Sequence, residues 1–265
     1  MADGGHAAVL AAGLAGGNKR SGTVGVVVLA NLAADARLRA FGHLAVGWYR
    51  LQGTPGLTFA KVLGSGRDGG FRPSPSATHQ GLFLAFDNEA AADAFLARRS
   101  GLLDSLASNT REFLTAKLHA YASRGQWSGR SPLLVTAPRP APDSGPIASL
   151  TRASIRPSKA VEFWRHAPAS QDSLHASEGC LVAAGLGEMP LLRQATFTVW
   201  ESETAMERFS RQGAHLAAIR NAMASDHFSE SLFARFTVSD LRGTWHGRHF
   251  DGTTAVVPDR RHISS

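Results

Sequence analysis

Cysteine is nearly absent from this chain, because Cys180 is the only one among 265 residues. A single thiol cannot form an internal disulfide, and it cannot supply a multi-cysteine zinc site or an iron–sulfur cluster. The chain also lacks any run of about 18 apolar residues, so the sequence predicts no membrane-spanning helix. The 43% of residues that are hydrophobic suffice for two small domains or one fused domain.

Several familiar catalytic motifs are missing as well. The sequence has no Gly-x-Ser-x-Gly nucleophile turn, no Gly-x-x-x-x-Gly-Lys phosphate loop and no His-Glu-x-x-His metal pair. Gly64-Ser65-Gly66 resembles part of a dinucleotide-binding loop, but the third glycine and the following helix are absent, and a similar Gly-x-Gly recurs at Gly185. A structural bend of the backbone in both places is the favoured interpretation.

The charge of the chain is strongly basic, with a formal net charge of +7 and a pI of about 10.4. The basic residues are scattered, and no nucleic-acid-binding motif accompanies them, so the sequence disfavours a nucleic-acid partner. Two interpretations stay open. The charge is a solvated surface, or it attracts an anionic partner such as a membrane surface or the carboxylates of a cofactor.

One seven-residue pattern occurs twice and divides the chain into two copies of one unit. It reads RGQWSGR at residues 124–130 and RGTWHGR at residues 242–248, with five of the seven positions identical. Because both copies carry the tryptophan and the arginines, we expect these residues to be scaffold. The tryptophans would pack over the mouth of a barrel, and the arginines would cap carbonyls or bind carboxylates.

Both copies predict the same order of elements, which is strand, helix, two strands, one or two helices and a closing strand. This βαββαβ order is ferredoxin-like, with helices on one face of an antiparallel sheet and a second face that needs a partner sheet. We therefore predict an α+β fold in which two tandem ferredoxin-like units form a pseudo-symmetric barrel. The closing strands are expected at Leu114–Tyr121 and Leu232–Val238.

Composition predicts where the units begin and end. An Ala/Gly-rich stretch without a basic start favours a disordered tail over a signal peptide, and residues rich in Pro, Ala, Gly and Ser favour a linker. The predicted segments are a tail at 1–20, a first unit at 21–136, a linker at 137–146, a second unit at 147–250 and a tail at 251–265.

His215 is the most informative difference between the two copies. Ala218 and Ile219 lie three and four residues beyond it, so on a helix all three share one face and the imidazole can point inward among small residues. No histidine occupies the matching helix of the first unit, around residues 101–109. Taken alone, a satisfied core histidine remains the alternative.

Several segments together resemble the spheroidene monooxygenase family, the acyclic-carotenoid ketolases of purple bacteria. The resemblance extends from about Thr23 to Trp245, and the order of the segments is more specific than any one of them. The segments include GFRP at 70–73, GQWSG at 125–129, FWR at 163–165, GLGEMP at 185–190, TFTVW at 196–200 and AHLAAIR at 214–220.

The resemblance implies a dimeric α+β barrel that binds heme and inserts oxygen into an acyclic carotenoid or a similar apolar substrate. It implies His215 as the axial ligand of the heme iron, while other catalytic residues stay unassigned. Arginines would meet the propionates and aromatic residues would line the heme. These further cofactor-binding residues are Arg165, Arg193, Arg220, Phe163, Trp164, Phe197 and Trp200.

The resemblance also implies an external electron donor and a cytoplasmic protein that touches the inner face of the membrane, and it allows a homo-oligomer. Two alternatives stay open at this point, because one barrel fold hosts several chemistries. One is a heme- or lipid-binding barrel without oxygenase turnover. The other is a different heme enzyme or a cofactor-free enzyme of the same fold.

Overall fold

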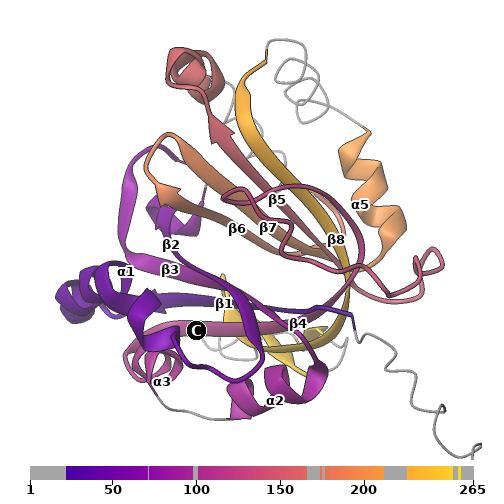
Figure 1. Cartoon of the computed structure of the whole chain (residues 1–265), viewed down its shortest axis with the longest axis horizontal. Helices are drawn as coiled ribbons and strands as arrows, with labels where there is room; N and C mark the ends of the chain where they lie inside the picture. Colours follow the sequence, from indigo (N-terminus) through magenta and orange to yellow (C-terminus); the bar gives the residue numbers. More distant parts are fainter. Residues whose placement is uncertain are drawn as a thin grey trace, which may run out of the picture.

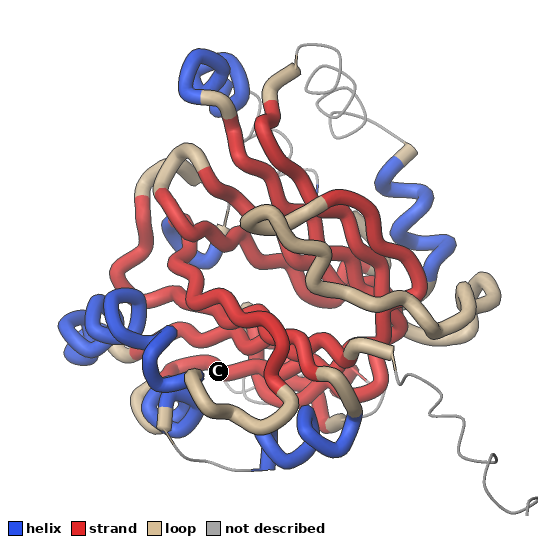
Figure 2. Tube along the Cα trace, viewed as in Figure 1, coloured by secondary structure: helices blue, strands red, loops and turns tan. Residues whose placement is uncertain are grey.

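Eight antiparallel strands close into a barrel, and the helices lie outside it (Figures 1 and 2). The computed structural model describes residues 22–70, 72–97, 101–165, 174, 177–211, 226–252 and 256–257. The strands follow the order β8-β4-β1-β3-β2-β6-β7-β5, and β5 pairs back to β8 to close the ring. This arrangement confirms the predicted α+β barrel of two ferredoxin-like units.

The first unit supplies β1 to β4 and three helices. β1 is a nearly continuous apolar run because it is buried on both sides, by the barrel interior and by the helices outside. The elements are β1 Val24–Leu32, η1 Ala34–Ala36, α1 Arg37–Leu51, β2 Leu57–Gly66, η2 Arg67–Gly69, β3 Pro75–Phe86, α2 Glu89–Ala97, α3 Leu102–Ala107 and β4 Thr110–Gly125.

The second unit repeats the same strand order and adds a short hairpin. A helical turn at residues 160–165 follows its first strand. β10 lies within the segment 251–265, where the sequence predicted a tail, and it pairs with β9. The elements are β5 Ile147–Ile155, η3 Pro157–Lys159, β6 Cys180–Met189, β7 Arg193–Trp200, α5 Glu203–Ser210, β8 Phe228–Trp245, β9 Arg248–Asp251 and β10 Val256–Val257.

Two seams of unequal length join the units. The long seam pairs β4 with β8, from Leu114 opposite Gly243 to Gly125 opposite Leu232. Both closing strands are therefore much longer than the sequence predicted, because each continues beyond its own unit to pair with the other. At the short seam, Gly64 of β2 lies opposite Gly187 of β6. The two Gly-x-Gly segments therefore lie on neighbouring strands of the barrel wall and pair with each other.

The core divides into layers that follow the alternation of side chains along the strands. Alternate residues of all eight strands fill the barrel interior in one apolar cluster that includes Phe83, Phe197 and Phe236. A second cluster lies between the outer face of the first unit and its helices. A smaller third cluster, which includes Trp200 and Met206, lies outside the second unit. None of the helices in the described ranges is long and apolar enough to cross a membrane.

The repeated Arg-Gly-x-Trp-x-Gly-Arg segments form matching turns that hold the two units together. Trp127 and Trp245 are both buried in the barrel cluster, and each indole donates a hydrogen bond at 3.0 Å, to Glu188 Oε2 and to the Ala183 carbonyl respectively. The amides of Gly129 and Gly247 donate to carboxylates on the closing strand of the opposite unit, Glu230 and Glu112.

The arginines of the repeat complete the same turns. Arg130 Nη2 donates to the Thr58 carbonyl at 3.3 Å, and Arg248 Nη1 donates to the Cys180 carbonyl at 2.6 Å. These carbonyls lie at the starts of β2 and β6, so the contacts are equivalent in the two units. These contacts confirm carbonyl capping for Arg130 and Arg248, whereas Arg242 pairs with the Asp240 carboxylate. The burial of Trp127 and Trp245 agrees with the scaffold interpretation.

The first glycine of each repeat allows the closest approach between units. Gly125 has φ of +94°, and a Cβ there would overlap the Ser231 carbonyl oxygen of β8. Gly129 has φ of +70°, but nothing lies within 4 Å of the position that its Cβ would take. Alanine at Gly129 would therefore introduce backbone strain alone, whereas alanine at Gly125 would add an overlap with the opposite strand.

We predict that Gly125→Ala lowers the free energy of unfolding by about 3 kcal/mol or more, because strain and overlap act together. Its matched control, Gly129→Ala, should cost about 1 kcal/mol because only backbone strain applies. Urea unfolding followed by circular dichroism measures both. Equal losses in the two variants would show that the contact with β8 is not what Gly125 serves.

Candidate functional site on the second unit

The outer faces of the two sheets differ in the side chains that they present. In the first unit, Val26 lies opposite Leu84 and Val28 lies opposite Leu82, and all four are fully buried beneath the helices. The same cross-strand positions of the second unit pair Ser149 with Thr198 and Thr151 with Thr196. Four aliphatic side chains are thus replaced by four smaller side chains that carry hydroxyl groups.

This replacement makes the outer face of the second unit unlike an ordinary sheet core. Ser149, Thr151 and Thr196 are only half-buried, while their counterparts in the first unit are inaccessible to solvent. Among the described elements, α5 covers the end of this face where β7 finishes. There Phe209 lies against Trp200, with ring centroids 5.1 Å apart. Small polar side chains in the middle of a sheet leave both space and hydrogen-bonding groups for a ligand. We call this surface the hydroxyl face and define it by Ser149, Thr151, Thr196 and Thr198.

The β8 side of the hydroxyl face carries one cation and one ring. Arg235 lies opposite Ser149, and Phe233 lies opposite Thr151. Arg235 Nη1 is 3.7 Å from Glu203 Oε1, and its side chain is 38% exposed, so its charge is only partly compensated. Neither residue was among the sequence-predicted site residues, because only the strand register brings them beside β5.

A buried carboxylate lies at the same edge. The side chain of Glu203, on the first turn of α5, is 4% exposed, and both of its oxygens accept from the Nε–H of Arg139, at 3.1 and 3.2 Å. Tyr121 of β4 donates its hydroxyl to the same carboxylate at 3.3 Å. Burial, together with the charge of Glu203, raises the pKa of Tyr121 to about 12, so the phenol stays protonated at neutral pH. These contacts hold α5 and the loop that carries Arg139 against the sheet.

The structure separates the residues that the sequence assigned to the site. Phe197 faces the barrel interior, while Trp200 of the same strand lies on the outer side. Phe163 and Trp164 pack together at 5.4 Å near the start of β8, where Phe163 also meets Phe228. Arg165 and Arg193 are exposed. His215 and Arg220 lie outside the described residues.

Another histidine, which the sequence analysis did not single out, lies beside this group. His227 immediately precedes β8 and is 2% exposed, and its Nε2 is 3.2 Å from Glu162 Oε2 without hydrogen-bond geometry. The contact with His227, followed by Lys159, holds the pKa of Glu162 below its usual value although burial opposes this. His227 is therefore a buried imidazole next to the start of β8.

Two other kinds of site are weakly supported among the described residues. Within those ranges, no group of three or more His, Cys, Asp or Glu side chains is arranged to hold a metal ion. Burial raises the pKa of the Cys180 thiol to about 11, so it is not the thiolate that nucleophilic chemistry requires. A heme iron, by contrast, needs only one side-chain ligand from the protein.

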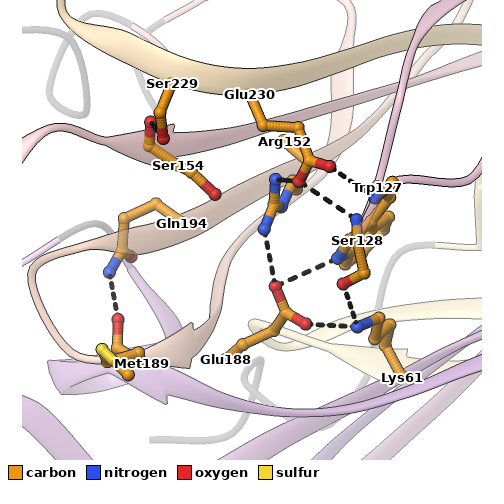
Figure 3. A network of polar contacts seen from close by, with 11 residues as sticks. Lys61, Trp127, Ser128, Arg152, Ser154, Glu188, Met189, Gln194, Ser229 and Glu230 are labelled. Carbon is orange, nitrogen blue, oxygen red and sulfur yellow. Dashed lines mark hydrogen bonds and ion pairs between the residues drawn. The ribbon is translucent and has the colours of Figure 1, made fainter.

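A charged network inside the barrel joins the two units (Figure 3). The Arg152 side chain of β5 is 2% exposed, and its guanidinium contacts both Glu188 of β6 and Glu230 of β8. Lys61 of β2 pairs with Glu188, and the Trp127 indole donates to the same carboxylate. Two cations and two carboxylates thus compensate one another.

The network is better suited to joining strands of the two units than to catalysis, because each of its charged groups is paired with another member of the network. Burial acts to raise the pKa of Glu188, but the hydrogen bond and charge of Lys61, with hydrogen bonds from Trp127 and Arg152, hold it below the ordinary value. Burial also opposes the shift at Glu230, where the Gly129 and Ser128 amides and Arg152 lower the pKa. Both carboxylates therefore stay ionised in the folded protein.

Comparison with known proteins identifies the family. The chain is 48% identical over 229 residues to spheroidene monooxygenase of Rubrivivax gelatinosus, an alignment that covers 86% of this chain and 87% of that protein. This chain belongs to the spheroidene monooxygenase family. A second member, from Rhodobacter capsulatus, is 34% identical over 200 residues, covering 75% of this chain and 82% of that protein. The chain is therefore an oxidoreductase of the monooxygenase class.

The solved structures support the architecture. The crystal structure of an aldoxime dehydratase matches 84% of this chain and 83% of its own, with a TM-score of 0.55 and 12% identity. At that identity the likeness bears on the fold alone. No family model matches the chain.

We predict that Glu188→Gln destabilises the protein by about 2–4 kcal/mol at neutral pH, because it leaves buried cations short of a carboxylate. The pKa of Glu188 in the folded protein is below its ordinary value of 4.5, so the stabilisation by the ionised carboxylate is complete above pH 4.5 and is lost as the pH falls through the folded pKa. The stability difference from wild type should therefore narrow in acid. Urea unfolding across a pH series measures it.

The matched control is Glu178→Gln, whose side chain is 92% exposed and pairs loosely with Arg208. This surface change should cost close to nothing at any pH. A difference between wild type and Glu188→Gln that stays constant from neutral pH to acid would contradict the ionised-network interpretation.

Proposed function

We propose that this protein is a heme-dependent monooxygenase that inserts oxygen into an acyclic carotenoid or a similar apolar substrate. Membership of a family whose relatives are named spheroidene monooxygenase supports the substrate class. We place the cofactor on the hydroxyl face of the second unit. One observation supports this location, namely that the equivalent positions of the first unit hold buried aliphatic residues. The scaffold is shared by both units, and this face is where they differ.

The dimensions and chemistry of the hydroxyl face fit a flat macrocycle. Four neighbouring strands, β8, β5, β7 and β6, lie side by side, and at normal strand spacing they span about 14 Å. The side chains in the middle are small, and Phe233 and Trp200 lie toward two margins. A planar ligand could therefore lie against the strands without displacing large side chains.

The path of the chain supports His215 as the axial ligand. β7 ends at Trp200 and α5 begins at Glu203, while β8 begins at Phe228, near Ile155 at the opposite end of the sheet. The chain between these points has to connect the two ends of the sheet, and His215 lies near the middle of this stretch of sequence, outside the described residues. We propose that this segment brings the His215 imidazole over the hydroxyl face.

When bound, the heme would supply the activation of oxygen, and the protein would bind and orient it. Arg235 is the described cation closest in the register to the hydroxyl face and suits a propionate. Arg220, Arg165 and Arg193 remain proposed partners for the same carboxylates. Phe163, Trp164 and Trp200 would exclude water, and Phe197 would support the face from inside the barrel.

The proposal includes three partners. Inserting one oxygen atom from O₂ requires two electrons and two protons to convert the other atom to water, so an external electron donor is needed. The apolar substrate would be taken from a membrane, and we propose a cytoplasmic protein that acts at the inner face of that membrane. A homo-oligomer is compatible with this arrangement.

The first test is an absorption spectrum of the purified full chain with added hemin, before and after dithionite. We expect a Soret band that shifts on reduction, and we expect His215→Ala to abolish it because the iron loses its protein ligand. His249→Ala is the matched control, since His249 is exposed on β9 and should leave the band unchanged. Reduction of carotenoid turnover to background in His215→Ala would accompany the spectral change.

Each other outcome has a distinct meaning. A Soret band lost in His227→Ala but kept in His215→Ala would move the axial ligand to the buried imidazole beside β8. Bound heme without turnover under any reductant would favour a binding protein. A protein that takes up no hemin would rule out the heme mechanism.

The second test restores the side chains of the first unit on the hydroxyl face. Ser149→Val with Thr196→Leu should reduce bound heme at least about tenfold, because the added methyl groups occupy the volume proposed for the macrocycle. Ser239→Val, at an exposed position of β8, is the control and should bind heme normally. Heme per chain and far-ultraviolet circular dichroism are measured together. Normal heme content in the folded double variant would exclude this face as the site.

A further inference from the structure

Helix α1 presents its large apolar side chains to solvent. Leu38 is 87% exposed, Phe41 is 62% exposed and Tyr49 is 69% exposed, and Trp48 is half exposed. The residues that α1 buries are instead Ala40, His43, Gly47 and Leu51, most of which are small or polar. A helix that packs on a soluble core ordinarily has the opposite arrangement.

The inward side of α1 explains why the bulky residues do not turn toward the sheet. α1 packs on β2 and β3 beside α3. A Cβ at Gly47 would lie 3.2 to 3.3 Å from Val62 and Leu102, so the helix is already close to its neighbours. His43 is buried and shares a 2.8 Å hydrogen bond with Ser105 of α3. The orientation of α1 is therefore determined by close packing and this polar contact.

The outward residues form one apolar stripe. At helical spacing, Leu38, Phe41, Ala45, Trp48 and Tyr49 lie on the side of α1 opposite the buried residues. Figures 1 and 2 show α1 at the periphery of the molecule, at the left of the view. A contiguous exposed stripe of this kind marks a surface that is covered by something else.

The charges on α1 indicate what covers it. The helix carries Arg37, Arg39 and Arg50, all exposed, and no acidic residue between Arg37 and Leu51. Arg37 lies at one margin of the stripe, and Arg39 with Arg50 lies at the other. Asp35, in the turn before the helix, is the one acidic neighbour in the adjoining sequence. Aromatic and leucine side chains flanked by arginines are the composition of helices that lie in the interface of an anionic bilayer.

We infer that α1 is the surface through which this protein docks onto an anionic lipid bilayer. The inference rests on the proposed function in one respect, because an apolar substrate dissolved in the bilayer gives docking its purpose. The stripe would enter the headgroup region while the arginines meet lipid phosphates. A second copy of the chain fits less well, since pairing α1 with itself brings together two helices of the same positive charge.

The test is flotation of the full chain with two kinds of vesicle, phosphatidylcholine alone and phosphatidylcholine mixed with phosphatidylglycerol. We expect binding to the anionic vesicles that weakens at high salt. Phe41→Ser with Trp48→Ser and Tyr49→Ser should lower the partition coefficient about 100-fold, because these side chains supply the apolar burial. Arg39→Gln with Arg50→Gln should lower it about 30-fold.

The matched control removes exposed apolar side chains elsewhere. Leu134→Ser with Val135→Ser changes two such residues in the loop after β4, away from α1, and should bind vesicles as wild type does. Circular dichroism confirms that every variant is folded. Equal binding of wild type and the triple α1 variant would overturn the inference, as would a wild-type protein that ignores anionic vesicles.

Two further readouts separate the competing explanations. If α1 is instead a contact between two copies of the chain, sedimentation velocity without lipid would show a dimer in the wild type and a monomer in the triple variant. That result, together with no vesicle binding, would replace the inference. Heme absorbance and turnover of a detergent-dispersed carotenoid should be unchanged in the α1 variants. Failure of those two measurements in the wild type would remove the proposed function and leave the vesicle result standing.

Discussion

Mutual burial of two sheet faces is the constraint on which the rest of this structure depends. Each ferredoxin-like unit carries its helices on the outer face of its sheet and leaves the apolar inner face uncovered, so neither unit could expose its inner face to water without a large cost in free energy. Closing β4 against β8 and β2 against β6 buries both inner faces in a single core. The repeated Gly-x-Trp turns and the network around Arg152 occur where chain from one unit meets chain from the other.

Pseudo-symmetry divides the chain into positions that hold the barrel and positions that are free to differ. The first glycine and the last arginine of each repeat make equivalent contacts in both units, because the two closing strands approach the opposite unit in the same way. The outer faces have no such shared demand. The first unit buries its outer face under three helices, whereas the second presents Ser149 and Thr196. Function is proposed where the scaffold does not constrain the side chains.

Much of the architecture could be predicted because it depends on local pattern and repetition. Period-two alternation, helical spacing and the seven-residue pattern that occurs twice indicated the two units and the order of their elements. The lengths of the closing strands could not be predicted, since the ends of β4 and β8 are stabilised by partners more than a hundred residues away. The register that brings Arg235 beside Ser149 depends on the same long-range pairing. The orientation of α1 was equally hidden, because it depends on how closely Gly47 approaches Val62.

The sequence alone therefore determined the family, the class of enzyme and the repeated barrel, because these depend on residue identity and order. It named His215 and a set of arginines and aromatic residues, which remain proposals. Tertiary structure decided which face of each strand a residue occupies, separating Phe197 in the barrel from Trp200 outside it. A side chain two residues along a strand keeps its face, and one residue along changes it, so only the closed and paired sheet reveals which residues share a surface.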